Sequence, residues 1–459
     1  MKNLKLIFKI ILILIFFTDC SKGDSSENNM DFNSDLPYIS LNKSFLSFED
    51  TMLTKSSITK SILISSKNLN SNINISISDG FELSIDNTTF QEKISLNPKE
   101  SLNVYVRFFP MELGDITGNI KIENNQTSTI NISLTGKATK LRFNYKTFKQ
   151  QHLAFGSGKN QSSIQKFDLH NDLNNVESIK MYIQLECPSG GCNAWDVYSN
   201  IMVKDPDSSE WLEIGRYITP YGTDNKKLDR GFEIDVTDFK SHLTGIVELK
   251  SFIEVWGSDG WNLSVDFDYV VGSPDYTNYK ISRILQYNGN SLQGVVYGED
   301  ESKFDLLKSV NIGSDVQSAH IRTIITGWGH ATPNDAGGRP CAEWCFRTHN
   351  IKINGANTFQ HYMGPIGCGS NPVSPQNGNW EPDRAGWCPG MEVPLRIDKF
   401  TNDISNTSFN YQYDFENWIN DLQSSASNIH AYYAISSFIV LKSNKEISAR
   451  CFHSLVIGC

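Results

Sequence analysis

Short runs in which apolar and polar residues alternate recur along most of this 459-residue chain. In residues 102–108 (LNVYVRF) every second side chain is apolar, and residues 130–134 (INISL) repeat the pattern. A period of two residues is typical of a β-strand that buries one face, and no helix of ordinary length fits residues 37–138. The sequence therefore predicts an all-β protein.

The first of these strand-rich segments covers residues 37–140. Its strands are short and are separated by Asn, Ser and Gly over ~100 residues, which predicts an immunoglobulin-like sandwich. The run VYVRFFPMELGDITGNIKI, followed by ISLTGKA, resembles the Hydin-type immunoglobulin-like domains. Because the segment carries no cluster of catalytic residues, we interpret it as a spacer or docking module, with carbohydrate binding as the alternative.

Residues 141–459 continue in the same style. Runs with period two or with buried-strand character predict strands at residues 180–186, 195–203, 233–236 and 247–256. A Gly-Ser-Pro turn at residues 272–274 marks a plausible domain boundary. Periodicity alone thus indicates two further all-β domains, at residues 141–276 and 277–459.

The charge balance limits the possible partners. The formal net charge is -10 and the isoelectric point is about 5.4. Nucleic acids and anionic membrane surfaces attract basic patches, and the sequence contains none. We therefore expect neither as a partner.

The N-terminus has the layout of an export signal. Three lysines lie among Leu, Ile and Phe, and a short apolar run precedes Cys20. This arrangement resembles a bacterial lipoprotein signal at residues 1–20, followed by a polar tether at residues 21–36. It predicts an outer-membrane or cell-surface lipoprotein whose membrane contact is a lipid on Cys20. Ordinary signal cleavage, which would give a periplasmic or secreted soluble protein, is the alternative.

Cysteine counting supports this assignment, because setting aside Cys20 leaves eight of nine cysteines, an even number. Proximity in the sequence suggests disulfides, and the last two cysteines to be placed would pair by elimination. The expected pairs are Cys187–Cys192, Cys341–Cys345, Cys451–Cys459 and Cys368–Cys388. A zinc site is the rival interpretation, but no set of Cys and His has convincing structural-site spacing, so we predict no metal.

Residues 327–349 (GWGHATPNDAGGRPCAEWCFRTH) are the segment richest in chemically active side chains. Cys341 and Cys345 bracket Glu343, so a disulfide between them would fix the direction of its carboxylate. Glu343 is therefore a candidate site residue. The plainer alternative is that the pentapeptide only staples a loop of a secreted protein.

Two further acids and one arginine complete the candidate set. Asp196 directly follows Trp195 after the Cys187–Cys192 spacing, although an aspartate there could simply be solvated. Glu254 interrupts the apolar run FIEVW, where a buried carboxylate needs a partner or a task. Arg384 could orient a carboxylate, or could form a structural salt bridge with a neighbouring acid.

Several of these motifs together resemble the bacterial peptide:N-glycosidase F family. They are GWGHA, CAEWCFRTHNI, NTFQH, NWEPDRAGWCPG, CPSGGCNAWD, EIGRYITPYG, EIDVTDF and SVDFDYVVGSPDY. The resemblance covers about residues 141–447 and leaves out the first 140 residues.

The resemblance implies two eight-stranded antiparallel jelly rolls, side by side, with a site in the groove between them. It implies an amidase that cleaves the bond between asparagine and the first N-acetylglucosamine of an N-glycoprotein or glycopeptide. In this family pattern Asp196 is the principal acid/base group, Glu343 acts through a water molecule and Glu254 supports charge and substrate position. Three of the four disulfides match the pattern, and the Cys451–Cys459 pair does not. No cofactor is implied, since carboxylates and water suffice for this bond, and we expect a monomer.

The resemblance also assigns residues that bind substrate. Arg384 would hold the carboxylates or the carbonyl oxygen, and aromatic side chains would stack on sugars, although buried aromatic residues are more often part of a core. The candidates are Trp195, Trp256, Trp328, His330, Arg384 and Trp387.

Two positions depart from the family pattern, because Ala194 and Val197 stand where well-studied members carry an acid and an arginine. Glycan preference, including tolerance of a core fucose, is therefore open. Two rival functions use the same residues. A glycoside hydrolase also employs paired carboxylates, and a non-catalytic glycan-binding protein would use the tryptophans alone.

Overall fold

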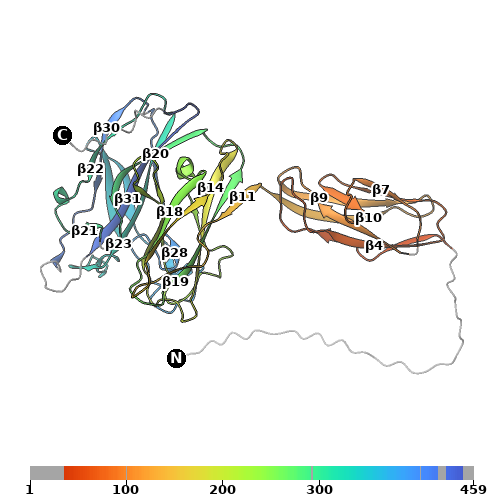
Figure 1. The fold of residues 1–459 in the computed structure, drawn as a ribbon, viewed down its shortest axis with the longest axis horizontal. Coiled ribbons are helices and arrows are strands. Elements are labelled where there is room, and N and C mark those ends of the chain that lie inside the picture. Colours follow the sequence, from red (N-terminus) through yellow and green to blue (C-terminus); the bar gives the residue numbers. More distant parts are fainter. Residues whose placement is uncertain (1–35, 100, 291–292, 404, 422–430, 448–459) are drawn as a thin grey trace, which may run out of the picture. The chain divides into compact units, whose positions relative to one another are not determined.

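The computed structural model describes residues 36–99, 101–290, 293–403, 405–421 and 431–447. Strands dominate, and the helices in this part of the chain are short 3-10 turns: η1 (Thr237–His242), η3 (Glu301–Lys303) and η4 (Cys368–Ser370). The prediction of an all-β protein is confirmed (Figure 1).

The N-terminal segment folds as a sandwich of two sheets. One sheet has the order β1 (Tyr38–Leu41), β4 (Lys60–Lys67), β8 (Leu102–Phe108), β6 (Phe81–Ser84). The other has the order β2 (Phe45–Ser47), β10 (Ile130–Thr139), β9 (Gly114–Glu123), β5 (Ile73–Ile77), β7 (Lys93–Leu96), with β3 (Thr51–Met52) paired to β10.

The core of this sandwich follows the alternation seen in the sequence. Val104, Val106 and Phe108 are fully buried on β8, and the residues between them are partly exposed. On β10, Ile132 and Leu134 are buried in the same way. Each strand therefore turns one face inward, as its period of two requires.

The second sandwich begins at residue 142. Its first sheet has the order β11 (Arg142–Lys146), β19 (Trp261–Val271), β14 (Val176–Glu186), β17 (Phe232–Asp235), with β12 (Gln151–Leu153) on β19. Its second sheet has the order β13 (Ser162–Asp168), β18 (Ile246–Ile253), β15 (Tyr198–Lys204), β16 (Trp211–Ile218), β28 (Met391–Glu392).

The third sandwich contains most of the remaining strands. One sheet has the order β20 (Asn278–Tyr287), β31 (Tyr432–Ser443), β23 (Ser318–Trp328), β29 (Arg396–Lys399), with β21 (Val295–Val296) on β31. The facing sheet has the order β22 (Leu307–Asn311), β30 (Ser408–Asp414), β26 (Arg347–Ile353), β27 (Ala356–Met363). A small pair, β24 (His330–Ala331) and β25 (Cys341–Ala342), stands apart. Short extra strands bring both sandwiches above the eight strands expected.

The second and third sandwiches share buried surface. Ile281, Phe438 and Val440 of the third sandwich belong to the hydrophobic core of the second, where Phe438 meets Phe239 edge to face at 5.4 Å. Strand β28 lies beyond most of the third sandwich in sequence, yet it pairs with β16 of the second. The interface is thus built from apolar contacts and from a strand that crosses between the sandwiches.

Two expected strands are truncated at the end nearest the candidate acids. Strand β15 begins at Tyr198 rather than at Trp195, and β18 ends at Ile253 rather than at Trp256. Asp196 and Glu254 therefore lie just outside the regular ladders. The apolar residues on the far side of each acid continued the pattern, so the sequence predicted longer strands than the hydrogen-bonded ladders contain.

Two predictions about cysteines lie outside the described residues: lipidation of Cys20 and the disulfide Cys451–Cys459. None of the helices in the described part of the chain has the length and apolar character that a membrane crossing requires.

The shared core predicts that the second and third sandwiches unfold together. Replacing Phe438 by alanine should lower the free energy of unfolding by about 3–5 kcal/mol, because it removes a ring buried between them. Hydrogen exchange read by mass spectrometry should show the same loss of protection in β14 and in β26. The exposed Ile164 provides the control, since Ile164→Ala should change stability by less than about 0.5 kcal/mol. Faster exchange confined to β26 would contradict a shared core.

Candidate active site

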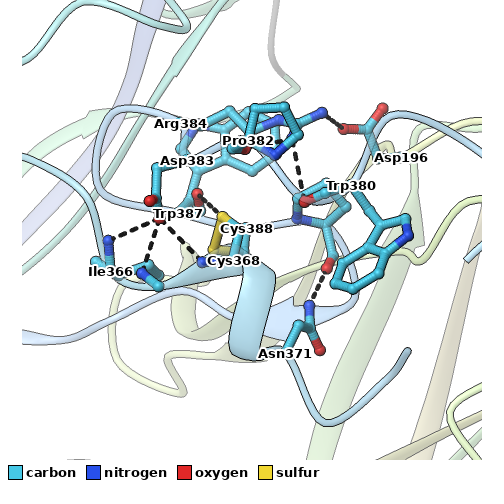
Figure 2. Close-up of a disulfide and its surroundings, with 12 residues drawn as sticks. Asp196, Ile366, Cys368, Asn371, Trp380, Pro382, Asp383, Arg384, Trp387 and Cys388 are labelled. Carbon is cyan, nitrogen blue, oxygen red and sulfur yellow. Dashed lines mark hydrogen bonds and ion pairs between the residues drawn. A yellow bond between two sulfur atoms is a disulfide. The ribbon is translucent and has the colours of Figure 1, made fainter. Parts of the chain in front are cut away.

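A fully buried arginine lies at the centre of the candidate site. Arg384 is held by three backbone carbonyls of its own loop: its Nη2 donates to Asn379 at 2.6 Å, and its Nη1 donates to Pro382 at 2.8 Å and to Trp380 at 3.5 Å. These contacts hold the guanidinium in place independently of other groups, and Figure 2 shows those to Trp380 and Pro382. Among the described residues, Arg384 forms its ion pairs with Asp196 and Glu343. It does not form the suggested structural salt bridge with an acid next to it in the sequence.

Asp196 meets this guanidinium from the second sandwich. Its Oδ2 lies 3.4 Å from Nη2 of Arg384, and only 9% of its side chain is exposed (Figure 2). The residue lies in the loop before β15, where the hydroxyl of Thr219 accepts a hydrogen bond from the Val197 backbone and donates one to the Trp195 carbonyl. The loop backbone on both sides of Asp196 is therefore anchored.

Glu343 approaches the same guanidinium from the third sandwich. Its Oε1 lies 3.7 Å from Nε of Arg384. This distance is too long for a hydrogen bond. The Glu343 carbonyl accepts a hydrogen bond from the Ala385 backbone at 2.8 Å, which ties the cysteine-bracketed loop to the loop of Arg384. One cation thus joins acids that lie 147 residues apart in sequence.

The two acids have different pKa values. Burial raises the pKa of Asp196 to about 6, against the opposing effects of the Arg384 charge and of a hydrogen bond from Tyr221. Burial and then the charge of Asp196 raise the pKa of Glu343 to about 8. Near neutral pH, therefore, the pair carries one proton, on Glu343, while Asp196 is ionised. Such a pair offers a proton donor and a proton acceptor side by side.

Tyr221 was not singled out from the sequence, although it lies in the EIGRYITPYG motif. Its hydroxyl accepts a hydrogen bond from Nη2 of Arg384 at 3.1 Å and interacts with the carboxylate of Asp196. Its ring packs so closely against Gly378 that a Cβ there would lie 2.3 Å from a ring carbon. Gly378 is therefore required for Tyr221 to reach the two charged groups.

His330 and Trp344 form a second layer beside Glu343. The indole Nε1 of Trp344 donates to Nε2 of His330 at 3.1 Å, so this nitrogen is an acceptor and the imidazole is neutral. Partial burial also lowers the pKa of His330. The 3.7 Å approach of His330 to Glu343 is therefore a polar contact without ionic character. The Trp344 ring also covers Arg384, 4.4 Å from the guanidinium carbon.

Glu254 directly follows the last residue of β18, which pairs with β15. It is buried, at 4% exposure, and its backbone N–H donates to the Tyr198 carbonyl at 2.9 Å. The pairing of β18 with β15 therefore brings it close to the loop of Asp196. The structure gathers Asp196 and Glu343 on Arg384, whereas the backbone of Glu254 is bonded to Tyr198, two residues after Asp196.

The tryptophans divide into exposed and buried groups. Trp195 and Trp256 are 66% and 59% exposed, and Trp256 meets the exposed ring of Phe155 edge to face. Trp387 is fully buried and leaves no face for a sugar, contrary to the expected substrate contact. Its ring lies 4.6 Å from that of Trp328, which is partly exposed. The buried ring of Trp387 thus packs against one side of the Trp328 ring.

Three predicted disulfides are present: Cys187–Cys192, Cys341–Cys345 and Cys368–Cys388. Each lies in a loop that carries a site residue. The first precedes Asp196, the second brackets Glu343, and the third closes the loop that holds Arg384 (Figure 2). They therefore limit how far these loops can move.

Cys368, Asp383 and Cys388 are close enough together to suggest a metal site. The two sulfurs are bonded to each other, however, and Oδ1 of Asp383 accepts backbone hydrogen bonds from Ile366, Gly367 and Cys368 at 2.8–3.2 Å. Asp383 thus organises the loop next to Arg384, and these groups do not make a ligand set.

Comparisons with known proteins match both parts of the chain. Residues 297–440 match the family model described as Peptide-N-glycosidase F, C terminal. Residues 36–139 match the model Cep192 domain 4, so the Hydin-type assignment stays a prediction.

One curated relative is the peptide-N(4)-(N-acetyl-beta-D-glucosaminyl)asparagine amidase F of Elizabethkingia miricola, 50% identical over 307 residues, or 67% of this chain and 85% of the relative. The solved structure of PNGase F, a glycosylasparaginase from Flavobacterium meningosepticum, is also 50% identical. It aligns with a TM-score of 0.65 over 67% of this chain and 98% of its own. The structure of PNGF-II shares the fold at 11% identity, with a TM-score of 0.54 over 86% of this chain and 90% of its own.

The 50% identity extends over 85% of the relative's length. The chain therefore belongs to the peptide:N-glycosidase F family.

Proposed function

We propose that this protein is an amidase that hydrolyses the linkage between asparagine and N-acetylglucosamine in N-glycoproteins or glycopeptides, leaving aspartate in the peptide and releasing the glycan as a glycosylamine. The observation that carries this proposal is the pair Asp196 and Glu343, joined by Arg384 in a member of this family. Its relative in Elizabethkingia miricola is named for this activity.

The separated pKa values support a division of roles. Asp196, ionised at neutral pH, is the acid/base group at the scissile linkage. Glu343, which holds its proton to about pH 8, acts through a bound water as the proton donor, while Asp196 accepts the proton that the attacking water loses. Arg384 is fully buried and therefore positions the carboxylates, without reaching the substrate's carbonyl oxygen itself.

The exposed aromatic groups supply contacts for the sugar. Trp195, Trp256 and Trp328 present ring faces suited to stacking on pyranose rings. His330, with 55% of its side chain exposed, offers a polar contact next to Glu343. Glu254 supports the charge and position of the substrate. Ala194 and Val197 depart from the family pattern. Substrate contacts at these two positions therefore differ, and glycan preference is the property that this difference affects.

The remaining predictions concern export. Disulfides form in oxidising compartments, so those present favour export. Lipidation of Cys20 would anchor the enzyme at the cell surface, with the immunoglobulin-like domain of residues 37–140 as a spacer between tether and catalytic module. The catalytic module then consists of residues 141–276 and 277–459 and acts as a monomer.

Isotope placement tests which bond breaks. A glycopeptide digested in heavy-oxygen water should yield a sugar-free peptide with aspartate at the former asparagine, carrying one solvent oxygen. The glycan should keep both core N-acetylglucosamines and first appear as the amine. A glycoside hydrolase would instead place the heavy oxygen on the sugar and leave one N-acetylglucosamine on asparagine. That result would refute the proposal, and binding without cleavage would favour a glycan-binding protein.

Asp196→Asn should lower kcat by about 10²–10⁴-fold, because the amide can neither accept nor release the proton. The exposed Asp168 on β13 of the same sheet is the matched control, and Asp168→Asn should keep wild-type kcat. Both should unfold at nearly the same temperature. An Asp196→Asn enzyme with more than about a tenth of the wild-type rate would contradict the assigned role.

Tyr221→Phe should shift the acidic limb of the pH–rate profile. The wild-type limb is expected near pH 6, where Asp196 loses its proton. The Tyr221 hydroxyl lowers the pKa of Asp196, so its removal should raise that pKa and move the limb to higher pH. Activity should therefore fall more at pH 6 than at pH 8. A profile that is scaled down without a shift would show that the hydroxyl does not act on Asp196.

A further inference from the structure

A second buried ion pair lies away from the candidate site, between the second and third sandwiches. Arg216 and Glu213, both on β16, are fully buried and form two parallel hydrogen bonds, Nε to Oε1 at 2.9 Å and Nη2 to Oε2 at 2.8 Å. Burial alone would raise the pKa of Glu213, but the charge and hydrogen bonds of Arg216 hold it below its usual range. Both side chains therefore stay charged.

The remaining hydrogen bonds of Arg216 and Glu213 are made mainly with residues of the third sandwich. Nη1 of Arg216 donates to Oγ1 of Thr326 at 2.8 Å and to the Ala434 carbonyl at 2.6 Å. Oε2 of Glu213 accepts from Oγ of Ser436 and from Nδ2 of Asn288, each at 2.6 Å. Four contacts thus cross the interface. Because buried charges tolerate little loss of such partners, they fix one relative placement of β16 against β23 and β31.

The network continues into the candidate site through Tyr198. The hydroxyl of Tyr198 is 3.2 Å from Oε1 of Glu213 and donates to the Asn288 carbonyl at 2.8 Å. Its ring covers the Arg216 guanidinium at 4.8 Å. Tyr198 lies two residues after Asp196, and its carbonyl receives the backbone N–H of Glu254. The same tyrosine therefore positions the chain segments of two proposed catalytic acids.

A second branch reaches the substrate side through Thr326. Oγ1 of Thr326 accepts from Arg216 and also from the indole Nε1 of Trp328, at 2.9 Å. The Trp328 ring meets Tyr198 edge to face, at 6.2 Å between centroids. The orientation of this indole thus depends on the same guanidinium.

We propose that Arg216 and Glu213 are positioning residues for the amidase reaction, which align Asp196, Glu254 and Trp328 across the interface through Tyr198 and Thr326. The inference rests on the proposed function and extends it to a pair that touches no substrate. Misplacement of reacting groups by about 1 Å can cost on the order of 10²-fold in rate, so the exact seating of this pair matters for turnover.

The interface contains a matched control. Arg322 on β23 is also buried and also crosses between the sandwiches, since its Nη1 lies 3.2 Å from Asp238 and its Nη2 donates to the carbonyls of Ile214 and Asp235. Within the described part of the chain, the groups that Arg322 contacts directly do not include a proposed site residue. Arg322→Lys therefore tests the effect of loosening the interface alone.

The kinetic experiment compares Arg216→Lys with Arg322→Lys in the full chain. Each keeps the charge and loses the planar, bidentate geometry. We expect both to lower the melting temperature. Arg216→Lys should also lower kcat per folded molecule by roughly 10- to 100-fold, whereas Arg322→Lys should leave kcat within about twofold. Equal losses of kcat in both variants, or wild-type kcat in folded Arg216→Lys, would overturn the proposal.

A second measurement does not depend on activity. In protein labelled with 15N-tryptophan, the Nε1–H signal of Trp328, assigned with Trp328→Phe, should move in Thr326→Val and in Arg216→Lys and stay in place in Arg322→Lys. If wild-type protein cleaves no glycopeptide, the proposed function fails and this signal alone decides whether the link exists. An unmoved signal in Arg216→Lys refutes the link.

If Arg216→Lys does not fold, the variants that remove only a hydroxyl decide the matter. Tyr198→Phe should lower kcat, and Thr326→Val should raise KM more than it lowers kcat, because the first acts on the acids and the second on the indole. Wild-type constants in both would overturn the proposal.

Discussion

The site depends on a buried cation that two acids share. Arg384 has no exposed surface and is held by carbonyl oxygens of its own loop, so its charge cannot be satisfied by water. The ionised Asp196 balances this charge, and Glu343 lies 3.7 Å from its Nε. Removing one partner of such a group costs about 3–5 kcal/mol. The same contact that creates the pair of unequal pKa values therefore also holds the two sandwiches in register at the site.

The sheets themselves carry little of this chemistry. Asp196, Glu254 and Arg384 lie just beyond strand ends or in loops, and Glu343 lies between β25 and β26. Strands provide fixed anchor points, while disulfides and backbone hydrogen bonds to side chains such as Asp383 shape the loops. This arrangement is common in enzymes, since loops on a rigid scaffold can be varied without loss of the core.

The sequence predicted the fold class because alternation is a local property, as residues 102–108 show. The three disulfides were predictable for a similar reason, with two formed between cysteines four or five residues apart. Tyr221 was not predicted, because its role comes from contacts with residues 25 and 163 positions away.

Trp387 illustrates the opposite error. A tryptophan in a functional motif was expected to face the substrate, yet it is completely buried against Trp328. Composition cannot separate a ring that stacks on a sugar from one that supports such a ring. The same holds for Glu213 and Arg216, whose spacing in sequence gives no sign that their partners lie on β23 and β31.

The pairing of β28 with β16 limits how the sandwiches can be exchanged between genes during evolution. A strand supplied by the last third of the chain completes the edge of the second sandwich, and Phe438 and Val440 complete its core. A gene that encoded the second sandwich alone would leave an open strand edge and an uncovered apolar face, both of which promote aggregation. Recombination can therefore exchange the two sandwiches only as a pair.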